Sequence, residues 1–407
     1  MFYSEFKNFN KYFKIYLFFI LFFSCIQLFW KHEGGTDSTM SEWLINYQGG
    51  FVRRGLLGEF FFQIATNFQI KIRFIIFIFQ ISIYSLYLYL LYKYFSIIKK
   101  NFLVILSIFS PLLIIYNLAE TETLARKEIL IFIHFLIMLI FFKQKEIQTL
   151  YLSITYPLLM LVWEPIVFFS GFYLIILLID MRINSYWNLF KKLLLPALPS
   201  VMVFLIIVFN NYTTSNQDLM CSNLQKYVGE RCYMSLGYVT TSIQENYMSL
   251  FRDIKIIYLF RYMLALLIGF FPLILILTNL KKTKKIKNQF IKETNILKLF
   301  ILVSLPVLNL FMMGLDWGRW CNIFYFYSIT FIFYLIIKEY YILDLKNIKK
   351  YIKSNFNKTK VKNYSLVLFI IFSFTWNLKA TFKEDIGSLP IYRMPAKTIK
   401  SLIQNHL

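Results

Sequence analysis

The chain has 407 residues, of which 58% are hydrophobic and 16% are charged, and its net charge is +23. Soluble domains carry about 45–50% apolar and about 25% charged residues, so this composition excludes an ordinary soluble protein. Repeated apolar runs of roughly 17–25 residues are the signature of membrane-spanning helices. We therefore predict an integral membrane protein, in which the positive charge bears first on orientation and not on nucleic acid.

Eleven apolar segments predict the membrane-spanning helices. The expected fold is an all-α transmembrane bundle with about 11 spans, forming a single integral membrane domain over residues 1–407. The first segment follows three lysines but lacks a small-x-small cleavage site, so we predict an uncleaved first span. The predicted spans cover residues 13–31, 72–96, 102–118, 127–142, 147–162, 166–181, 193–210, 256–279, 297–315, 321–338 and 364–378.

Lysine-rich and lysine-poor connections alternate between these spans. One set of connections holds 26 Lys and Arg against 6 Asp and Glu, whereas the opposite set holds 18 against 15. Because basic residues concentrate on the cytoplasmic side, we predict a cytoplasmic N-terminus and an extracytoplasmic tail over 379–407. The predicted outer segments hold nearly all the unusual polar motifs, which places a candidate site on the outer face.

The first outer segment contains the motif Gly49–Glu59, in which Arg53, Arg54 and Glu59 lie among four glycines. Guanidinium groups bind phosphate through paired donors, and glycine lets backbone N–H groups come close to a ligand. Upstream of the motif, Asp37 supplies another carboxylate. Downstream of it, we expect a short helix with one apolar face to lie along the membrane interface. The alternative is that the two arginines only hold lipid headgroups.

A second outer segment, Glu120–Glu128, reads E-T-E-T-L-A-R-K-E. Glu120 and Glu122 form an acidic pair that can hold a divalent metal or divide the roles of acid and base. Arg126 and Lys127 add positive charge directly after this pair. The alternative is that the acids only favour the N-terminus of the following helix.

Two short breaks in the apolar sequence carry the remaining candidates. Glu164, in Trp163-Glu164-Pro165, interrupts a long apolar stretch, and a carboxylate in apolar surroundings is costly unless it is paired. Asp316 and Arg319 lie three residues apart in a short segment with two tryptophans, so they can pair at the mouth of the bundle. The alternatives are a plain turn at the first break and an aromatic belt with a structural ion pair at the second.

Two cysteines of the outer segment 211–255, Cys221 and Cys232, are eleven residues apart. On the oxidising side of a membrane such a pair can close a disulfide that staples the loop. His134, inside the fourth predicted span, is interpreted as a hydrogen-bonded structural residue. No Cys/His spacing resembles a zinc site, so no metal site is assigned.

The layout of residues 1–145 resembles type C glycosyltransferases, which use polyprenyl-phosphate-linked sugars. The resemblance rests on one span after a cytoplasmic N-terminus, an acidic first outer loop with an interfacial helix, and a second acidic pair after the third span. It implies that Asp37 helps to activate the acceptor and that Glu120 and Glu122 lie by the metal or donor phosphate. The first loop has Asp37 followed by Glu42 in place of a D-x-D motif, so no cofactor is predicted and a divalent metal is the alternative. Residues 146–378 add further spans.

The whole chain is also similar to membrane proteins of bacterial surface-polysaccharide clusters, including the Wzy-type O-antigen and capsule repeat-unit polymerases. The segments N-Y-Q-G-G-F-V-R-R-G-L-L-G-E and G-L-D-W-G-R-W carry this resemblance. It implies a multi-pass enzyme of the bacterial inner membrane that builds lipopolysaccharide or capsule glycan. Its partners would be a polyprenyl-diphosphate-linked oligosaccharide, membrane lipid, a flippase and a chain-length regulator, with no nucleic acid.

Together these features predict an extracytoplasmic active site for glycan assembly. Asp37 would take the proton of the acceptor hydroxyl while the diphosphate leaves, with Glu120 and Glu122 as the other catalytic acids. The alternatives are a transporter of the same lipid-linked sugar, a transferase that adds a single sugar, and a receptor or structural role. Transporters tend to have inverted repeats and charges at the bilayer midplane, which this sequence lacks. The predicted substrate-binding residues are Arg53, Arg54, Glu59, Arg126, Lys127, Glu164, Asp316 and Arg319.

Overall fold

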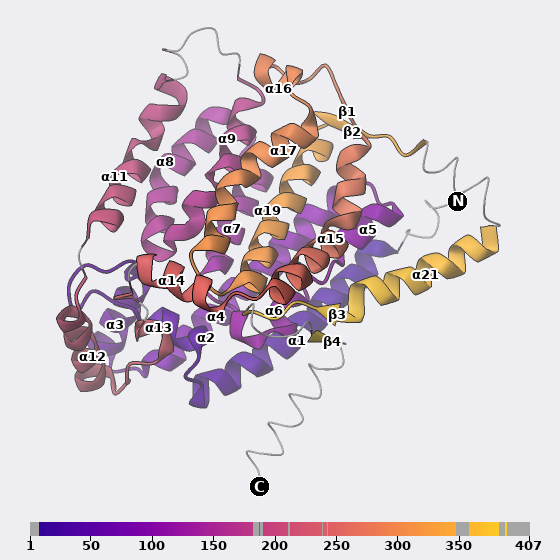
Figure 1. The fold of residues 1–407 in the computed structure, drawn as a ribbon. Helices are drawn as coiled ribbons and strands as arrows, with labels where there is room; N and C mark the ends of the chain where they lie inside the picture. The colour runs from indigo at the N-terminus through magenta and orange to yellow at the C-terminus, as the bar shows by residue number, and fades with distance from the viewer. Residues whose placement is uncertain are drawn as a thin grey trace.

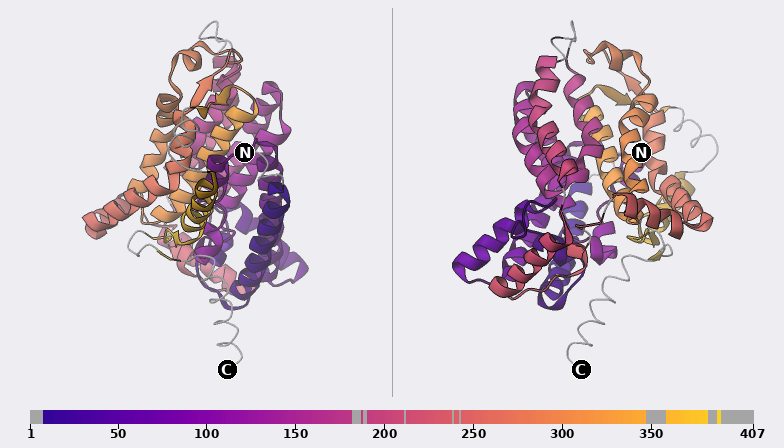
Figure 2. Two further views of the ribbon diagram at one scale, coloured as in Figure 1. Left: turned by 90° about the vertical axis from the view of Figure 1, so that its right-hand side faces the viewer. Right: turned by 60° about the vertical axis from the view of Figure 1, so that its left-hand side comes forward.

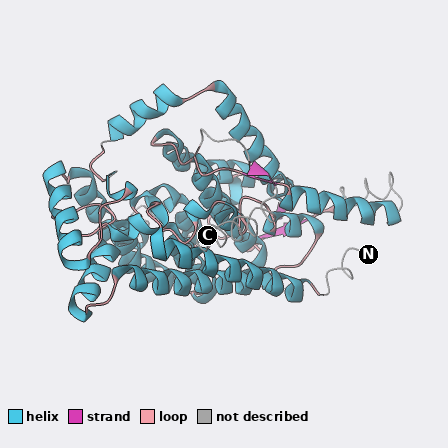
Figure 3. Cartoon of the chain, turned by 90° about the horizontal axis from the view of Figure 1, so that it is seen from below, coloured by secondary structure: helices cyan, strands magenta, loops and turns pink. Residues whose placement is uncertain are grey.

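The architecture was obtained as a computed structural model, and it is almost entirely helical (Figures 1 and 3). The structure describes residues 8–181, 187, 190–210, 212–237, 239–241, 243–346, 358–381 and 387–388. Within these residues, five helices are long and apolar enough to cross a membrane, and four further apolar helices are shorter. The structure therefore supports a helical membrane protein, while the count of 11 spans remains a prediction.

The N-terminal third contains two long helices that pack side by side, α1 and α4. Both are apolar along nearly their whole length, and each buries one face in the bundle while the other face stays exposed. Between them lies the amphipathic helix α3, which matches the short helix expected after the arginine motif. The bounds of this part are α1 Phe9–Gly34, α2 Ser38–Ser41, η1 Glu42–Leu44, α3 Leu56–Phe68 and α4 Ile72–Ile97.

The third predicted span, 102–118, is wrong as a continuous helix. The helix α5 (Phe102–Ile108) ends before Pro111, and the chain passes through turns to the short α6 (Tyr116–Ala119). Proline lacks the backbone N–H and disfavours helical backbone at the residue before it. The irregular segment is buried, and Asn322 Nδ2 donates to the carbonyl oxygens of residues 112 and 113 at 2.7 and 3.0 Å. Such partners allow non-helical backbone at membrane depth.

The middle of the chain forms a set of neighbouring helices, with a break at Trp163-Glu164-Pro165 as predicted. Pro165 lies in the first turn of the 3₁₀ helix that follows, where its missing N–H costs no hydrogen bond. The bounds are η2 Thr121–Thr123, α7 Glu128–Phe141, α8 Lys145–Val162, η3 Glu164–Phe169, α9 Ser170–Leu178, the π-helical turn η4 Phe190–Leu194, α11 Leu195–Phe209, α12 Thr214–Val228, α13 Met234–Gly237 and α14 Ile243–Asp253.

The C-terminal part contains the central helix of the bundle, α19. Nearly every residue from Trp317 to Leu335 is buried, because this helix is apolar on all sides and is packed by α7, α9 and α15. Among the described residues, two short antiparallel strand pairs, β1 with β2 and β3 with β4, depart from the predicted all-α fold. The bounds are α15 Ile256–Thr278, β1 Leu280–Lys282, α16 Gln289–Glu293, α17 Ile296–Ser304, η5 Leu305–Val307, α18 Leu308–Met312, α19 Trp317–Ile337, β2 Tyr341–Leu343, α21 Lys358–Phe374, β3 Trp376–Asn377 and β4 Gly387–Ser388.

The two sets of connections gather at opposite ends of the bundle. At the upper end in Figure 1, strands from two lysine-rich connections pair, and Lys287 N donates to the carbonyl of Ile179, near the end of the predicted span 166–181. At the lower end, ion pairs join the first outer segment to the second, to the break at Glu164 and to the segment before α19. This is the arrangement expected if successive connections alternate between the two sides of a membrane. The predicted tail, 379–407, lies largely outside the described residues.

Candidate functional site

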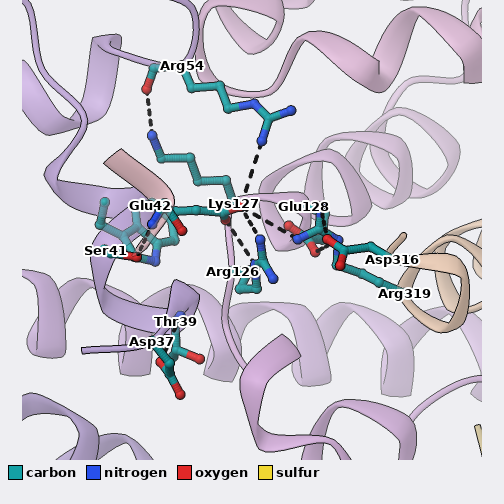
Figure 4. Close-up of polar contacts among 12 residues, drawn as sticks. Asp37, Thr39, Ser41, Glu42, Arg54, Arg126, Lys127, Glu128, Asp316 and Arg319 are labelled. Atoms are coloured by element: carbon teal, nitrogen blue, oxygen red, sulfur yellow. Dashed lines mark hydrogen bonds and ion pairs between the residues drawn. The ribbon is translucent and has the colours of Figure 1, made fainter. Parts of the chain in front are cut away.

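Glu42 lies at the centre of a group of charged side chains at the lower end of the bundle (Figure 4). Its side chain is only 2% exposed and faces three guanidinium groups. Arg126 Nε donates to Oε2 at 3.0 Å, while Arg319 Nη1 and Arg54 Nη1 lie 3.5 and 3.8 Å from Oε1. Burial alone would raise the pKa of this carboxyl, but the three arginines outweigh burial and hold it well below its usual range.

We name this group the charged cluster. It joins the first outer segment, the second outer segment, the break before α9 and the N-terminus of α19, which are far apart in the sequence. It therefore unites six of the eight predicted substrate-binding residues directly, and Arg53 borders them. Its members are Glu42, Arg53, Arg54, Arg126, Lys127, Glu128, Glu164, Asp316 and Arg319.

Arg54 and Glu164 form a bidentate ion pair across 110 residues of sequence. Arg54 Nε and Nη2 donate to the two carboxylate oxygens at 2.7 and 2.8 Å. Arg54 adopts a left-handed backbone conformation with φ of 67°, which is costly for a residue with a side chain and must be held by its surroundings. Arg53, the neighbouring residue, lies 4.0 Å from Glu164 and donates to the Thr241 carbonyl at 3.3 Å.

The glycines around the two arginines pack against protein atoms. A Cβ at Gly58 would lie 1.9 Å from the Ile45 carbonyl oxygen, and one at Gly55 would lie 2.2 Å from the Tyr47 ring. Gly50 has φ of +108°, a conformation that side chains rarely adopt. These contacts show that the glycines permit close packing of the loop, while the approach of backbone N–H groups to a ligand stays a prediction.

The second outer segment inserts two cations under the arginine loop. Lys127 is fully buried, and its Nζ donates to the Arg54 carbonyl oxygen at 2.5 Å. Ala125, two residues earlier, has φ of 49°, and its carbonyl accepts from Trp43 Nε1 and Gln80 Nε2, both at 3.2 Å. These bonds fix the turn that directs Arg126 toward Glu42.

Arg319 connects the cluster to the central helix. Its Nε lies 3.2 Å from Glu128 Oε1, and its Nη2 lies 3.2 Å from Asp316 Oδ2, the i,i+3 pair that the sequence predicted. Both Glu128 oxygens are buried and lack a hydrogen bond in the described part of the chain. Burying a carboxylate is energetically costly, and the ion contact with Arg319 offsets part of that cost.

The three predicted catalytic acids lie in different surroundings. Asp37 caps the short α2, pairs with Lys31 and accepts from Thr39 N at 2.9 Å, and Figure 4 shows it apart from the cluster. Glu120 is buried, accepts from Asn377 Nδ2 at 2.9 Å and lies 3.4 Å from Lys379 Nζ. Glu122 is exposed. The two acids of the predicted pair therefore lie in different surroundings, one buried and one exposed. Within the described ranges, no group of three or more His, Cys, Asp and Glu side chains could hold a metal ion.

Glu59 serves the loop and not the cluster. Its oxygens accept from Tyr47 N at 3.0 Å, Gln48 Nε2 at 2.8 Å and Gln63 Nε2 at 2.7 Å. The structure places this carboxylate in the turn that precedes the arginines and outside the charged cluster, and its substrate-binding role stays a prediction.

The predicted disulfide is present and closes the segment that covers the arginine loop. Cys221 and Cys232 are bonded, with their Cα atoms 5.4 Å apart. Cys221 lies within α12, which lies beside α3 (Figure 2), and Asn216 Nδ2 of the same helix donates to the Gly49 carbonyl at 2.6 Å. Just before the second cysteine, Glu230 accepts a bidentate pair from Arg73 at 2.6 and 3.0 Å.

The exposed edge of the cluster carries both signs of charge. Asp316 is 35% exposed and Arg53 is 28% exposed, whereas Glu42, Arg126 and Arg319 are buried. The cluster contains four arginines, one lysine and four carboxylates. Such an edge can bind an anion through the arginines and receive a proton at the exposed carboxylate.

The sequence reasoning did not select Glu42 or Glu128, although both stand in the segments that it singled out. Charge complementarity could have identified these two acids. Each of the two outer segments carries a pair of cations, and buried cations require carboxylates near them. No protein-family model, curated protein or solved structure matches the chain.

Proposed function

We propose that the chain is a glycosyltransferase of the polysaccharide-polymerase type, which assembles a bacterial surface glycan at the outer face of the cytoplasmic membrane. The substrate would be a saccharide linked to a polyprenyl diphosphate. On this proposal all eleven apolar segments lie at membrane depth, the N-terminus is cytoplasmic, and the charged cluster faces outward. The observation that carries the proposal is the convergence of four guanidinium groups and one ammonium at one mouth of an apolar bundle.

The exposed arginine edge suits a diphosphate. Arg53 lies 4.0 Å from Glu164 and is the most exposed cation of the cluster. A diphosphate placed there would meet paired N–H donors of fixed geometry, and Arg54 beside it is already oriented by Glu164. As the sugar is transferred, negative charge grows on the leaving diphosphate, and preorganised cations stabilise that charge most.

Asp316 and Asp37 are both exposed enough to take a proton from an acceptor hydroxyl. Asp316 is 35% exposed beside the cluster, and Asp37 is 30% exposed next to Lys31. Glu42 is unsuited as a base, because its three arginines lower its pKa, so that it binds a proton weakly, and because they cover it. We propose Asp37 as the base, as the resemblance to type C transferases implies, with Asp316 as its competitor. Loss of activity in D316N with retention in D37N would reverse that assignment.

The test uses a strain deleted for this gene and complemented by wild type, Arg53→Lys or Arg252→Lys at matched membrane levels. Lysine keeps the charge of Arg53 but loses the paired donors, so R53K is expected to cut the surface-polysaccharide ladder strongly. Arg252 is 78% exposed in α14 and is the control, which should give a full ladder. A wild-type ladder from R53K would contradict the phosphate clamp.

The same polysaccharide gel distinguishes the possible roles of the chain in glycan synthesis. A single repeat unit on the surface without a ladder indicates a polymerase, with a flippase and a chain-length regulator as its partners. Absence of any complete unit indicates a transferase that adds one sugar to the unit. Complete lipid-linked units trapped on the cytoplasmic side would indicate a transporter instead.

A further inference from the structure

A cavity of about 1210 Å³ opens at the end of the bundle opposite the charged cluster. It lies between α8, the end of α9 and the start of α11, among the lysine-rich connections. A cavity of this size can hold a headgroup with the first part of its hydrocarbon chains. Nothing in the proposed transferase activity uses this place.

The polar half of the cavity is basic. Lys145, Lys191, Lys192 and Lys287 line it, against two carboxylates in the same wall. Lys145 already has protein partners, since its Nζ donates to the Ile176 carbonyl at 2.5 Å and lies 3.5 Å from Asp180 Oδ2. The other three lysines are exposed, so the cavity presents an excess of mobile ammonium groups to an anion.

The other half of the cavity is apolar. Leu150 of α8 and Leu195 of α11 line it and are 61% and 51% exposed. No residue of α11 is buried, although it packs along α8 (Figure 1) and belongs to one of the helices long enough to cross a membrane. A helix that is apolar and exposed in this way is expected to face lipid. The ligand must therefore be amphipathic.

We propose that this cavity binds an anionic phospholipid, with its phosphate among Lys191, Lys192 and Lys287 and its acyl chains along α8 and α11. Basic pockets between membrane helices on the lysine-rich side are suited to phosphate headgroups. A soluble phosphate would leave Leu150 and Leu195 in water, so the apolar half of the lining favours a lipid. The site rests on the membrane placement of the chain and is independent of the proposed transferase activity.

The experiment measures retention of phosphatidylglycerol by the purified full chain in phosphatidylcholine nanodiscs, using native mass spectrometry. Each lysine near an anionic surface contributes about fivefold in affinity, so Lys191→Gln/Lys192→Gln is expected to lower retention roughly 25-fold. The control, Lys284→Gln/Lys298→Gln, removes the same charge from exposed positions at the same end outside the cavity and should retain lipid as wild type does.

Three results would overturn the proposal. Equal losses in the test and control variants would mean that net surface charge alone attracts the lipid. Equal competition by soluble glycerol phosphate would show that the acyl chains contribute nothing. Retention of polyprenyl phosphate with no retention of phosphatidylglycerol would assign the cavity to the carrier lipid. The thermal unfolding midpoint of each variant is measured as well. Equal midpoints show that a variant with lower lipid retention is still folded.

Discussion

Replacing Glu42 with Gln tests whether this one carboxylate holds the charged cluster together. The substitution keeps the shape of the side chain but leaves three guanidinium groups around a neutral amide, at 3.0 to 3.8 Å in the contacts with Arg126, Arg319 and Arg54. Removing one partner of a buried ion pair costs about 3–5 kcal/mol, because the remaining charge is left buried without compensation. We expect E42Q to fall in that range.

The assay is denaturant unfolding of the purified protein in detergent micelles. The matched control is Glu122→Gln, which removes an exposed carboxylate from the adjoining segment and should change stability by no more than about 0.5 kcal/mol. A second variant combines E42Q with Arg126→Met and so removes the arginine that donates to Glu42 in wild type. This double variant should recover part of the free energy of unfolding that E42Q loses. Equal stability of E42Q and E122Q would refute the central place given to Glu42.

Three further predictions follow from individual contacts. The pKa of Glu42 in the folded protein lies below its ordinary value of about 4.3, so its stabilising contribution is complete above that pH and is lost as the pH falls further. The free energy of unfolding should therefore fall more steeply with decreasing pH in wild type than in E42Q. Cys221→Ser should cost about 2–4 kcal/mol and speed proteolysis of the covering segment, whereas an unchanged cleavage rate would contradict its role as a staple. Gly58→Ala should cost about 1–3 kcal/mol through overlap with the Ile45 carbonyl, while Gly34→Ala, with no atom within 4 Å of the new Cβ, should not destabilise; equal thermal midpoints would contradict the packing account.

The positions and lengths of the apolar segments predicted most of the helices, because hydropathy and helix propensity act locally along the chain. It failed at 102–118, where the run of apolar residues continues but Pro111 ends the helix. The deciding fact there is that Asn322, 210 residues from Leu112, supplies donors to the freed carbonyls. A contact of that range cannot be read from one sequence.

The site was predictable as a set of residues but not as a set of pairs. Arg54, Glu164 and Arg319 stand out because charges are rare in this sequence and each is costly in apolar surroundings. Their pairing depends on the packing of α7, η3 and α19, which the sequence does not reveal. The glycines of the arginine loop were interpreted by ligand chemistry, whereas their contacts are with Ile45 and Tyr47.

The acids were predicted less well than the cations. Asp37 was chosen by resemblance, and the structure places it with Lys31, outside the ion pairs that meet at Glu42. Glu120 and Glu122 looked like one pair in sequence, but the 3₁₀ turn between them directs one toward Asn377 and leaves the other exposed. Two residues apart on such a turn, their side chains do not share a face.

The most direct test of the proposed clamp is binding of radiolabelled polyprenyl diphosphate to the purified chain in phosphatidylcholine nanodiscs. Wild type and Arg252→Lys are expected to bind it more tightly than polyprenyl monophosphate, because paired guanidinium groups recognise the second phosphate. Arg53→Lys should lose most of that preference, with its unfolding transition unchanged, since Arg53 lies at the exposed edge of the cluster and lysine keeps its positive charge. Equal preference for the diphosphate in Arg53→Lys and wild type would contradict the claim that this arginine edge is the substrate site.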